Sequence, residues 1–231
     1  MNSIAIDFPI SKALELADFK AMDYYAVANY DLPIELMMEN AGLQLAQLVA
    51  SVVSKKQPIK IGIGNGNNGG GGLVAARRLA AWGYTVYLDV FTELTKELPL
   101  KQLNRALKMG TIRDEVHNPI QNPAVWVDAY LGFSQRLPLS DSLTQIITEA
   151  NDSAAIRIAL DIPTGYLGDS NSPYFKAHKV LTLAAPKRIL FGLSTDTEIY
   201  VADLGIPKAV YEKFGLEILP FDTNNSIKLN R

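Results

Sequence analysis

The sequence predicts an α/β fold with a mostly parallel, doubly wound sheet, and three observations lead to it. Segments with strand and helix patterns alternate along the chain, which is typical of parallel sheets with helical crossovers. A glycine-rich segment, residues 64–72, follows the first strong strand pattern. Asp128 and Asp161 each end an apolar run, as residues at the carboxyl edge of such a sheet do.

Composition favours one domain over residues 1–231, because 231 residues with 48% hydrophobic content can bury a large core. The net charge of −2 provides no large positive field, so we expect no nucleic-acid partner. The lack of cysteine excludes disulfides and thiolate chemistry, and His117 and His178 are interpreted as structural. No apolar run is long enough for a membrane span, and Asp7 and Pro9 do not fit a secretory signal. We therefore expect a cytoplasmic protein that binds no membrane.

Two helices are expected before the sheet, over about residues 11–55. The first occupies residues 11–30, where apolar and charged residues interleave, with Ser11 as its N-cap; a partly ordered arm is the alternative. The second starts at Pro33 and carries an apolar stripe at spacings of three and four. That stripe could form a dimer interface, although packing within the chain explains such stripes at least as often.

The sheet and its helices are expected over about residues 58–216. Apolar and β-branched runs predict strands at residues 59–63, 85–91, 125–128, 157–161, 179–183 and 199–202. Helical patterns lie between them at residues 73–82, 99–109 and 141–150. The polar C-terminal tail, residues 222–231, is expected to fray.

Residues 64–72, GNGNNGGGG, are expected to form a turn between the first of these strands and the next helix. Glycines let backbone amides approach a ligand, and the positive end of the helix favours phosphate or pyrophosphate. No Lys-Ser or Lys-Thr pair follows, so this is not a triphosphate-binding P-loop. Asn67 and Asn68 can donate and accept hydrogen bonds, which suits a polar ligand or a hydrated ion.

Four charged residues are candidates for the carboxyl edge of the sheet. Asp89 lies about 20 residues beyond the glycines, where dinucleotide-binding oxidoreductases place a ribose-binding carboxylate, so that function is a rival hypothesis. Asp128 and Asp161 could face a ligand, or could simply cap a turn or helix. Lys187 could neutralise phosphate, or could be an ordinary surface lysine.

Four motifs in order, GNGNNGGGGLVAARRLAAWGY, VDAYLGFS, ALDIPTG and TLAAPK, are preceded by LMMENAG. Together they resemble the YjeF N-terminal domain family, the NAD(P)HX epimerases, and the resemblance extends as far as VADLGIP near Gly205. It implies a Rossmann-like, three-layer α/β/α domain, usually dimeric. Such a domain interconverts the R and S epimers of hydrated NADH or NADPH, a metabolite-repair reaction in which the dinucleotide is the substrate and not a cofactor.

The resemblance also assigns site residues by motif. Those that would contact the ligand are Asn67, Asn68, Gly69, Gly70, Gly71, Gly132, Phe133, Ser134, Gln135, Arg136, Leu137, Pro138 and Asp161. Asp161 would face the hydrated nicotinamide ring as the catalytic general acid or base. Asn68, Asp128 and Thr164 match the positions that bind one potassium ion per subunit, with Thr164 replacing the more usual serine, and their oxygens suit a hard cation.

The sequence departs from the family pattern in two ways. The pattern reads GNNGGDG, and Gly71 stands where it has aspartate, so a ligand-facing carboxylate is lost. This motivates an alternative hypothesis, a catalytically impaired nucleotide-binding or dimerisation scaffold of the same fold. Many bacterial relatives also fuse this domain to a dehydratase, for which this chain has no room, so a separate NAD(P)HX dehydratase is expected in the same pathway.

Overall fold

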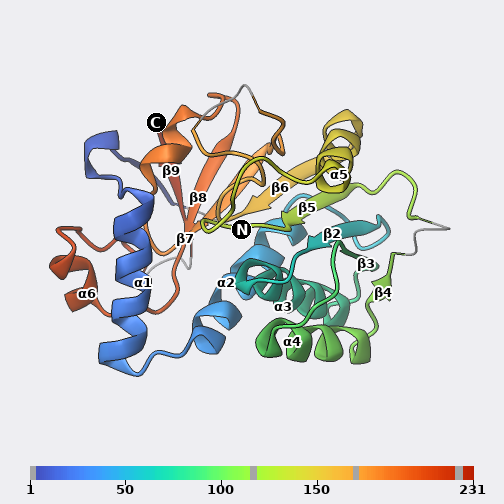
Figure 1. Ribbon diagram of the computed structural model, residues 1–231, viewed down its shortest axis with the longest axis horizontal. Coiled ribbons are helices and arrows are strands. Elements are labelled where there is room, and N and C mark those ends of the chain that lie inside the picture. The colour runs from blue at the N-terminus through green and yellow to red at the C-terminus, as the bar shows by residue number, and fades with distance from the viewer. Residues whose placement is uncertain (1–3, 115–118, 169–171, 222–225) are drawn as a thin grey trace.

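The computed structural model describes residues 4–114, 119–168, 172–221 and 226–231, and nine strands within them form one sheet (Figure 1). The strands are β1 (Ile4–Asp7), β2 (Ile59–Ile63), β3 (Val86–Val90), β4 (Ile112–Arg113), β5 (Val125–Ala129), β6 (Ile156–Leu160), β7 (Lys179–Leu183), β8 (Glu198–Ala202) and β9 (Ser226–Asn230). The helices are α1 (Leu16–Tyr30), α2 (Ile34–Ala50), α3 (Asn67–Ala81), α4 (Glu97–Lys108), α5 (Asp141–Asp152) and α6 (Lys208–Lys213), with short 3₁₀ helices η1 (Ile10–Lys12) and η2 (Arg188–Gly192).

The strand order is β1-β9-β8-β7-β6-β5-β2-β3-β4. All pairs are parallel except β8 with β9, so the predicted fold class is confirmed. In the middle, β2 lies beside β5, with Ile61 opposite Val127. The chain proceeds from β2 toward one edge and from β5 toward the other. This reversal makes the β2–β5 pair the topological switch point, where open α/β sheets bind their ligands.

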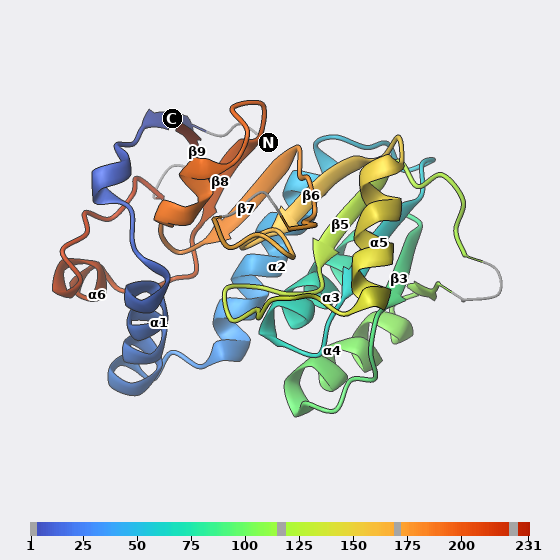
Figure 2. The same cartoon turned by 45° about the horizontal axis from the view of Figure 1, so that its top comes forward.

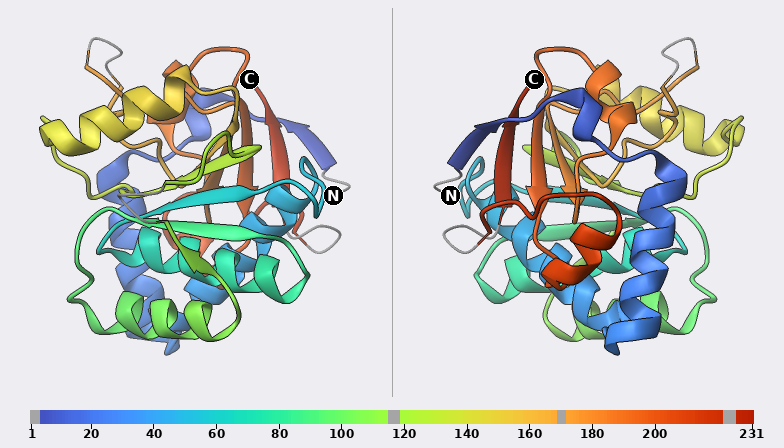
Figure 3. Two further views of the ribbon diagram at one scale, coloured as in Figure 1. Left: turned by 90° about the vertical axis from the view of Figure 1, so that its right-hand side faces the viewer. Right: turned by 90° about the vertical axis from the view of Figure 1, so that its left-hand side faces the viewer.

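Helices cover both faces of the sheet: α2, α3 and α4 lie on one face and α5 lies on the other (Figures 2 and 3). α2 and α3 pack so closely that a Cβ on Gly42 would overlap Val74. The apolar stripe of α2, including Leu45 and Val49, is buried within the chain and therefore gives no support to a dimer. Among the described helices, none is long and apolar enough to cross a membrane.

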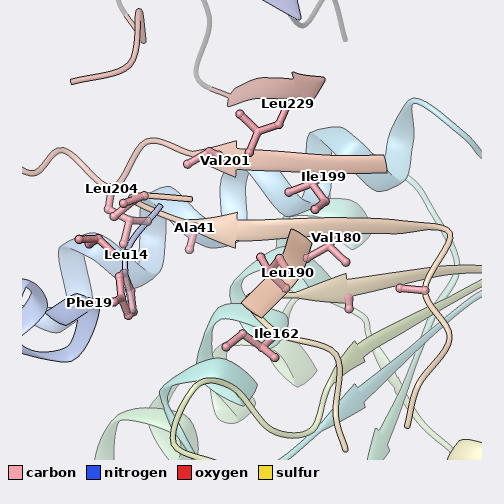
Figure 4. Packing of buried hydrophobic residues seen from close by; sticks show 14 of the residues in the cluster. Leu14, Phe19, Ala41, Ile162, Val180, Leu190, Ile199, Val201, Leu204 and Leu229 are labelled. Carbon is pink, nitrogen blue, oxygen red and sulfur yellow. The ribbon is translucent and has the colours of Figure 1, made fainter. Parts of the chain in front are cut away.

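One apolar cluster of the core contains residues of β7, β8 and β9 together with residues of α1 and α6. Val180 of β7, Ile199 of β8 and Leu229 of β9 are buried in one apolar cluster (Figure 4). Leu14 and Phe19 join this cluster from the N-terminal segment, beyond the arrowheads of β7 and β8 (Figure 4). The carboxyl edge of these strands is thus covered by residues from the start of the chain.

The first helix begins later than expected, at Leu16, with Glu15 as its N-cap. Ser11 lies in η1 instead, so its predicted role as N-cap is wrong. Leu14 explains the difference, because its amide donates to the carbonyl of Pro186 (2.9 Å) and its carbonyl accepts from the amide of Arg188 (2.8 Å). This strand-like pairing holds the segment extended, and the helix forms only after it.

The expectation that the C-terminal tail frays is wrong for residues 226–230, which form β9. The sequence SIKLN alternates, and the side chains of Ile227 and Leu229 are buried. β9 pairs with β8 through Val201 and Ile227 and also receives β1 on its other side. Arg231 then donates to backbone carbonyls of residues 190–197. Alternation over so short a polar segment was too weak a signal to set against its terminal position.

The glycine-rich segment is mostly helical, because α3 begins at Asn67 and not at residue 73. Glycine is a poor helix former, but its absent side chain lets this helix end pack directly on the sheet. A Cβ on Gly69 would overlap the carbonyl oxygen of Gly64, and one on Gly72 would lie 2.6 Å from the Cβ of Ala129. Close packing therefore requires glycine at these positions, independently of any ligand.

Candidate active site at the switch point

The N-terminal end of α3 lies at the carboxyl end of β2 and is open to an anion. Its N-cap is Gly66, which has no side chain to cap the helix. The first backbone bond at this end runs from the amide of Gly70 to the carbonyl of Gly66 (3.0 Å). The amides of residues 67–69 precede it and, as in any helix, have no intrahelical acceptor. These amides and the helix dipole together form a site suited to phosphate.

Asn68 links α3 to two parts of the sheet edge. Its Nδ2 donates to the carbonyl of Leu131 (2.7 Å), after β5, and to the carbonyl of Leu160 (3.2 Å), at the end of β6. Gly132 lies so close that a Cβ there would be 3.2 Å from Asn68. The Oδ1 atom of Asn68 is buried and has no hydrogen-bond partner. A buried polar oxygen without a donor is unusual and calls for a water or an ion.

Asp128 and Thr164 form a second polar unit beside Asn68. Asp128 is fully buried, and its two carboxylate oxygens accept bonds from the Thr164 hydroxyl (2.6 Å) and the Thr164 amide (2.7 Å). The Thr164 hydroxyl in turn accepts from the amide of Leu131 (3.1 Å). Burial raises the pKa of Asp128 to about 7, while the bonds from Thr164 act in the opposite direction.

The donor set around Asn68 fits a hard cation of low charge. It combines the unpartnered amide oxygen of Asn68, the carboxylate of Asp128, the hydroxyl of Thr164 and backbone carbonyls, all of them oxygen ligands. Within the part of the chain that the structure describes, no group of three or more His, Cys, Asp or Glu residues could hold a metal ion. A site with one carboxylate and neutral oxygens matches potassium better than a transition metal.

Asp161 and Lys187 form a buried ion pair, called the buried pair below. Asp161 follows β6 and is 1% exposed, Lys187 follows β7 and is 0% exposed, and 2.8 Å separates Oδ1 from Nζ. Lys187 also donates to the hydroxyl of Thr182 (2.8 Å) and the carbonyl of Leu183 (3.0 Å), so its three protons are engaged. The other carboxylate oxygen of Asp161 accepts from the amide of Phe133 (3.1 Å).

The backbone at Asp161 is held in an unusual conformation, with φ of 70°. A left-handed residue other than glycine costs about 1–3 kcal/mol and persists where its surroundings hold it, often at functional sites. Here the amide of Asp161 donates to the carbonyl of Leu181 (2.8 Å) while its carboxylate is fixed by Lys187. Burial lowers the pKa of Lys187, and the charge of Asp161 opposes that shift. The pair therefore places a carboxylate in one orientation.

The loop after β5 is anchored by Phe133 and Gln135 and exposes the residues around them. Phe133 donates to Asp161, and the buried side chain of Gln135 bonds to Pro163, Gly165 and the carbonyl of residue 166. Gln135 can thus offer a ligand little beyond its backbone. The predicted ligand-contact residues that are exposed or partly exposed here are Gly132, Phe133, Ser134, Arg136, Leu137 and Pro138.

Gly70 and Gly71 are buried inside α3. A Cβ on Gly70 would clash with Met38 of α2, and one on Gly71 would lie 3.0 Å from Cδ2 of Leu160. A side chain at position 71 would therefore enter the space beside Leu160, the residue before Asp161. The aspartate that the family pattern has at this position would lie in that region, and not among the first amides of α3.

Sequence reasoning missed the role of Lys187, since TLAAPK by itself does not distinguish a buried lysine from a surface lysine. The structure excludes the surface interpretation. Asp89, the ribose-binding candidate, accepts from the hydroxyl of Tyr130 (2.6 Å) and lies 3.7 Å from Lys60, so its geometry gives that role no support. His178 accepts from a backbone amide, as a structural histidine does, and His117 lies outside the described residues.

Comparison with known proteins points to one family. The family described as "YjeF-related protein N-terminus" matches residues 34–189. A Rhodopirellula baltica protein named NAD(P)H-hydrate epimerase is 31% identical over 211 residues, which cover 85% of this chain and 86% of that protein. An Anopheles darlingi protein of the same name is 31% identical over 228 residues, which cover 95% of this chain and 100% of that protein.

A longer relative and a solved structure extend the comparison. A Thermofilum pendens protein named bifunctional NAD(P)H-hydrate repair enzyme Nnr is 27% identical over 234 residues. This match covers 94% of this chain, which spans 44% of that protein's length. The crystal structure of the yeast protein YNL200c matches with a TM-score of 0.81 and 23% identity, covering 94% of this chain and 100% of that one. At this identity the likeness establishes the fold.

Proposed function

Since the chain belongs to the family of YjeF-related N-terminal domains, we propose that it is an NAD(P)H-hydrate epimerase. In this proposal its substrate is a small-molecule dinucleotide, hydrated NADH or NADPH, and it interconverts the R and S epimers. The observation that carries the proposal is the buried pair. It holds the Asp161 carboxylate at the same sheet edge as the free amides of α3, so one ligand can reach both a phosphate site and a proton-transfer group.

The reaction must remove and restore the configuration of the hydroxyl-bearing ring carbon. In one route, that hydroxyl gives its proton to a base while the bond from the carbon to the ring nitrogen breaks and the nitrogen takes a proton; reclosure on the other face reverses both transfers. In the other route, an acid protonates the leaving hydroxyl, and water returns to the opposite face and gives up a proton. Both routes need positioned proton transfer, which we assign to Asp161.

We expect the natural chain to exchange one purified epimer of NADHX or NADPHX into the mixture of both. Gly71→Asp should be unnecessary for this exchange, because position 71 faces Leu160 and not the first amides of α3. Chromatography of the separated epimers measures the exchange, with the Rhodopirellula baltica relative as positive control. An unchanged epimer ratio beside an active control would reject the proposal.

The Gly71→Asp variant also tests the scaffold alternative. If exchange begins only when this carboxylate is introduced, the natural chain has kept the fold and the ligand site but lost the reaction. If both proteins exchange the epimers at similar rates, the missing aspartate is tolerated. We expect the natural chain to exchange the epimers, and because Gly71→Asp places a carboxylate in buried space about 3.0 Å from Leu160, the two rates are compared at equal folded fraction.

We further propose that Asn68, Asp128 and Thr164 bind one potassium ion per subunit, supported by the unpartnered Oδ1 of Asn68. Such an ion would fix the junction of α3, β5 and β6 beside the ligand. Potassium should therefore raise the thermal midpoint relative to choline at equal ionic strength, by about 2–4 °C for each kcal/mol of binding free energy. Thermal unfolding monitored by circular dichroism measures the shift without any substrate.

The potassium prediction has a matched control in two neighbouring asparagines. Asn68→Ala should abolish the potassium-dependent shift. Asn65→Ala should retain it, because Asn65 only holds the loop at Thr95 and Lys96. A shift that survives Asn68→Ala would contradict this ligand assignment.

Two partners complete the proposed function. We propose that an NAD(P)HX dehydratase removes the hydration from the epimer that this protein supplies; the similar Thermofilum pendens protein is named a bifunctional NAD(P)H-hydrate repair enzyme. The homodimer implied by the family resemblance stays a prediction. Light scattering that shows a monomer at micromolar concentration would contradict it.

A further inference from the structure

α1 covers the buried pair with the side chain of Phe19. The ring of Phe19 lies 3.6 Å from Nζ of Lys187 and contacts the ring of Phe133 edge-on, at 5.2 Å between centroids. Figure 4 shows Phe19 beyond the ends of the neighbouring strands, beside Leu14. α1 and the loop after β5 therefore enclose the carboxylate that we assign to proton transfer.

Asp23 lies one helical turn after Phe19, at the edge of the same face of α1. Met22 and Ala26 beside it are fully buried, while Asp23 is half-buried. Among the described residues, no hydrogen bond or ion pair engages its carboxylate. A half-buried carboxylate without a partner gains nothing for stability, so its position next to an enclosed site calls for another explanation.

Electrostatics connect Asp23 with the buried pair. Burial raises the pKa of Asp23 above its ordinary 3.8, the negative charge of Asp161 raises it further, and Lys187 lowers it. The charge of Asp23 in turn raises the pKa of Lys187, against the lowering by burial. The three groups thus lie within electrostatic reach of one another, with one carboxylate fixed by the ammonium and the other free.

We infer that Asp23 is a second proton-transfer group of this site and works together with Asp161. The inference rests on the proposed function. Each route to epimerisation delivers one proton and removes another, so an acid and a base are both required. Asp161, fixed by Lys187, accepts the proton from the hydroxyl or the incoming water. Protonated Asp23 donates to the ring nitrogen or to the leaving hydroxyl. In the ring-opening route reclosure reverses both transfers, and in the dehydration route the proton that Asp161 gained returns to Asp23 by exchange with water before the next turnover.

Two charged groups from elements next to α1 have partners of their own. Lys213 of α6 stands over the ring of Tyr25 at 4.6 Å, and Arg188 pairs with Glu15 at 2.6 Å. Within the described residues, the buried pair therefore supplies the charges that act on the pKa of Asp23. A donor with a raised pKa is active below that pKa, so the exchange rate should fall as the pH rises through it.

The test compares pH–rate profiles of epimer exchange for the natural chain, Asp23→Asn and Asp18→Asn. Asp18 is an exposed carboxylate on the same helix and serves as the matched control. We expect exchange about 10²-fold slower in Asp23→Asn, without the fall at rising pH, and an unchanged profile in Asp18→Asn. Asp23→Glu should restore part of the rate. A natural chain that exchanges the epimers while Asp23→Asn matches its profile would overturn the inference but leave the proposed function intact.

A measurement independent of turnover separates the remaining outcomes. Carboxyl carbon NMR follows the titration of Asp23 in the natural chain and in Asp161→Asn. We expect the pKa of Asp23 to fall when Asp161 loses its charge, because that charge raises it. A titration that does not move would overturn the inference whatever the activity. Absence of exchange in the natural chain would instead overturn the proposed function, and the role of Asp23 with it.

Discussion

The Asp161→Asn variant is expected to exchange NADHX epimers about 10²–10⁴-fold more slowly than the natural chain. Asparagine keeps the size of aspartate and tolerates the left-handed backbone at this position, where φ is 70°. Its single amide oxygen can accept from the amide of Phe133 or from Lys187 but not from both, and it cannot take up a proton as a carboxylate does. The change therefore removes the proton acceptor but also leaves the ammonium of Lys187 without its counter-charge, so the slowing is measured only where urea unfolding shows a folded variant. Initial rates on a single purified epimer measure it.

Asp89→Asn is the matched control for this loss. Asp89 is also a carboxylate on the sheet, but it bonds to Tyr130 and not to the buried pair. We expect it to keep the natural exchange rate within a few-fold. Equal losses in both variants would mean that the rate follows general stability, and full activity in Asp161→Asn would remove Asp161 from the mechanism. An oxidoreductase that binds ribose through Asp89 would show the reverse order.

The sequence allowed prediction of the parts of the fold that have strong periodic signals. The central strands are buried apolar runs, and the residues at their ends, Asp128 and Asp161, had to meet at one edge because parallel strands end together. The helical start of α3 was not predictable by propensity, since four consecutive glycines disfavour a helix. Close packing on Gly64 and Ala129, a tertiary effect, decides their conformation.

The positions of Lys187 and Asp23 could not be predicted for a different reason, because both depend on contacts between distant segments. Lys187 is buried because Asp161, Thr182 and the carbonyl of Leu183 satisfy its protons, and these partners come from two strands that only the fold brings together. Asp23 was overlooked because a charged residue on an amphipathic helix is normally solvated. Its position beside the buried pair depends on the packing of Phe19 over Lys187, which leaves no trace in helical periodicity.

The family resemblance and the structure supply different parts of the site. The resemblance assigned Asn68, Asp128 and Thr164 to one ion site, and the structure gives a physical reason in the unpartnered oxygen of Asn68. It also made Gly71 a suspected defect. The packing against Leu160 weakens that suspicion, because position 71 is separate from the free amides of α3. Retention of the buried pair is the stronger argument for an active enzyme.

Lys187→Met is expected to lower the free energy of unfolding by about 3–5 kcal/mol, the usual cost of removing one partner from a buried ion pair. Methionine fills a similar volume, but it leaves Asp161 at 1% exposure without its cation. The hydroxyl of Thr182 donates a long hydrogen bond to Asp161 (3.4 Å), but it is neutral and cannot replace the charge of the ammonium. Urea unfolding at constant pH measures the loss, and an unchanged slope with denaturant shows that the folded state is retained.

The double variant Lys187→Met/Asp161→Asn separates a lost charge pair from lost packing. Removing both charges should recover part of the stability lost in Lys187→Met, because no uncompensated carboxylate remains buried. Lys208→Met is the surface control, since Lys208 is 70% exposed and its loss should change stability by less than about 0.5 kcal/mol. If the two losses simply add, the pair does not stabilise Asp161. If they compensate, Lys187 is the group that stabilises the buried side chain of Asp161 in its fixed position.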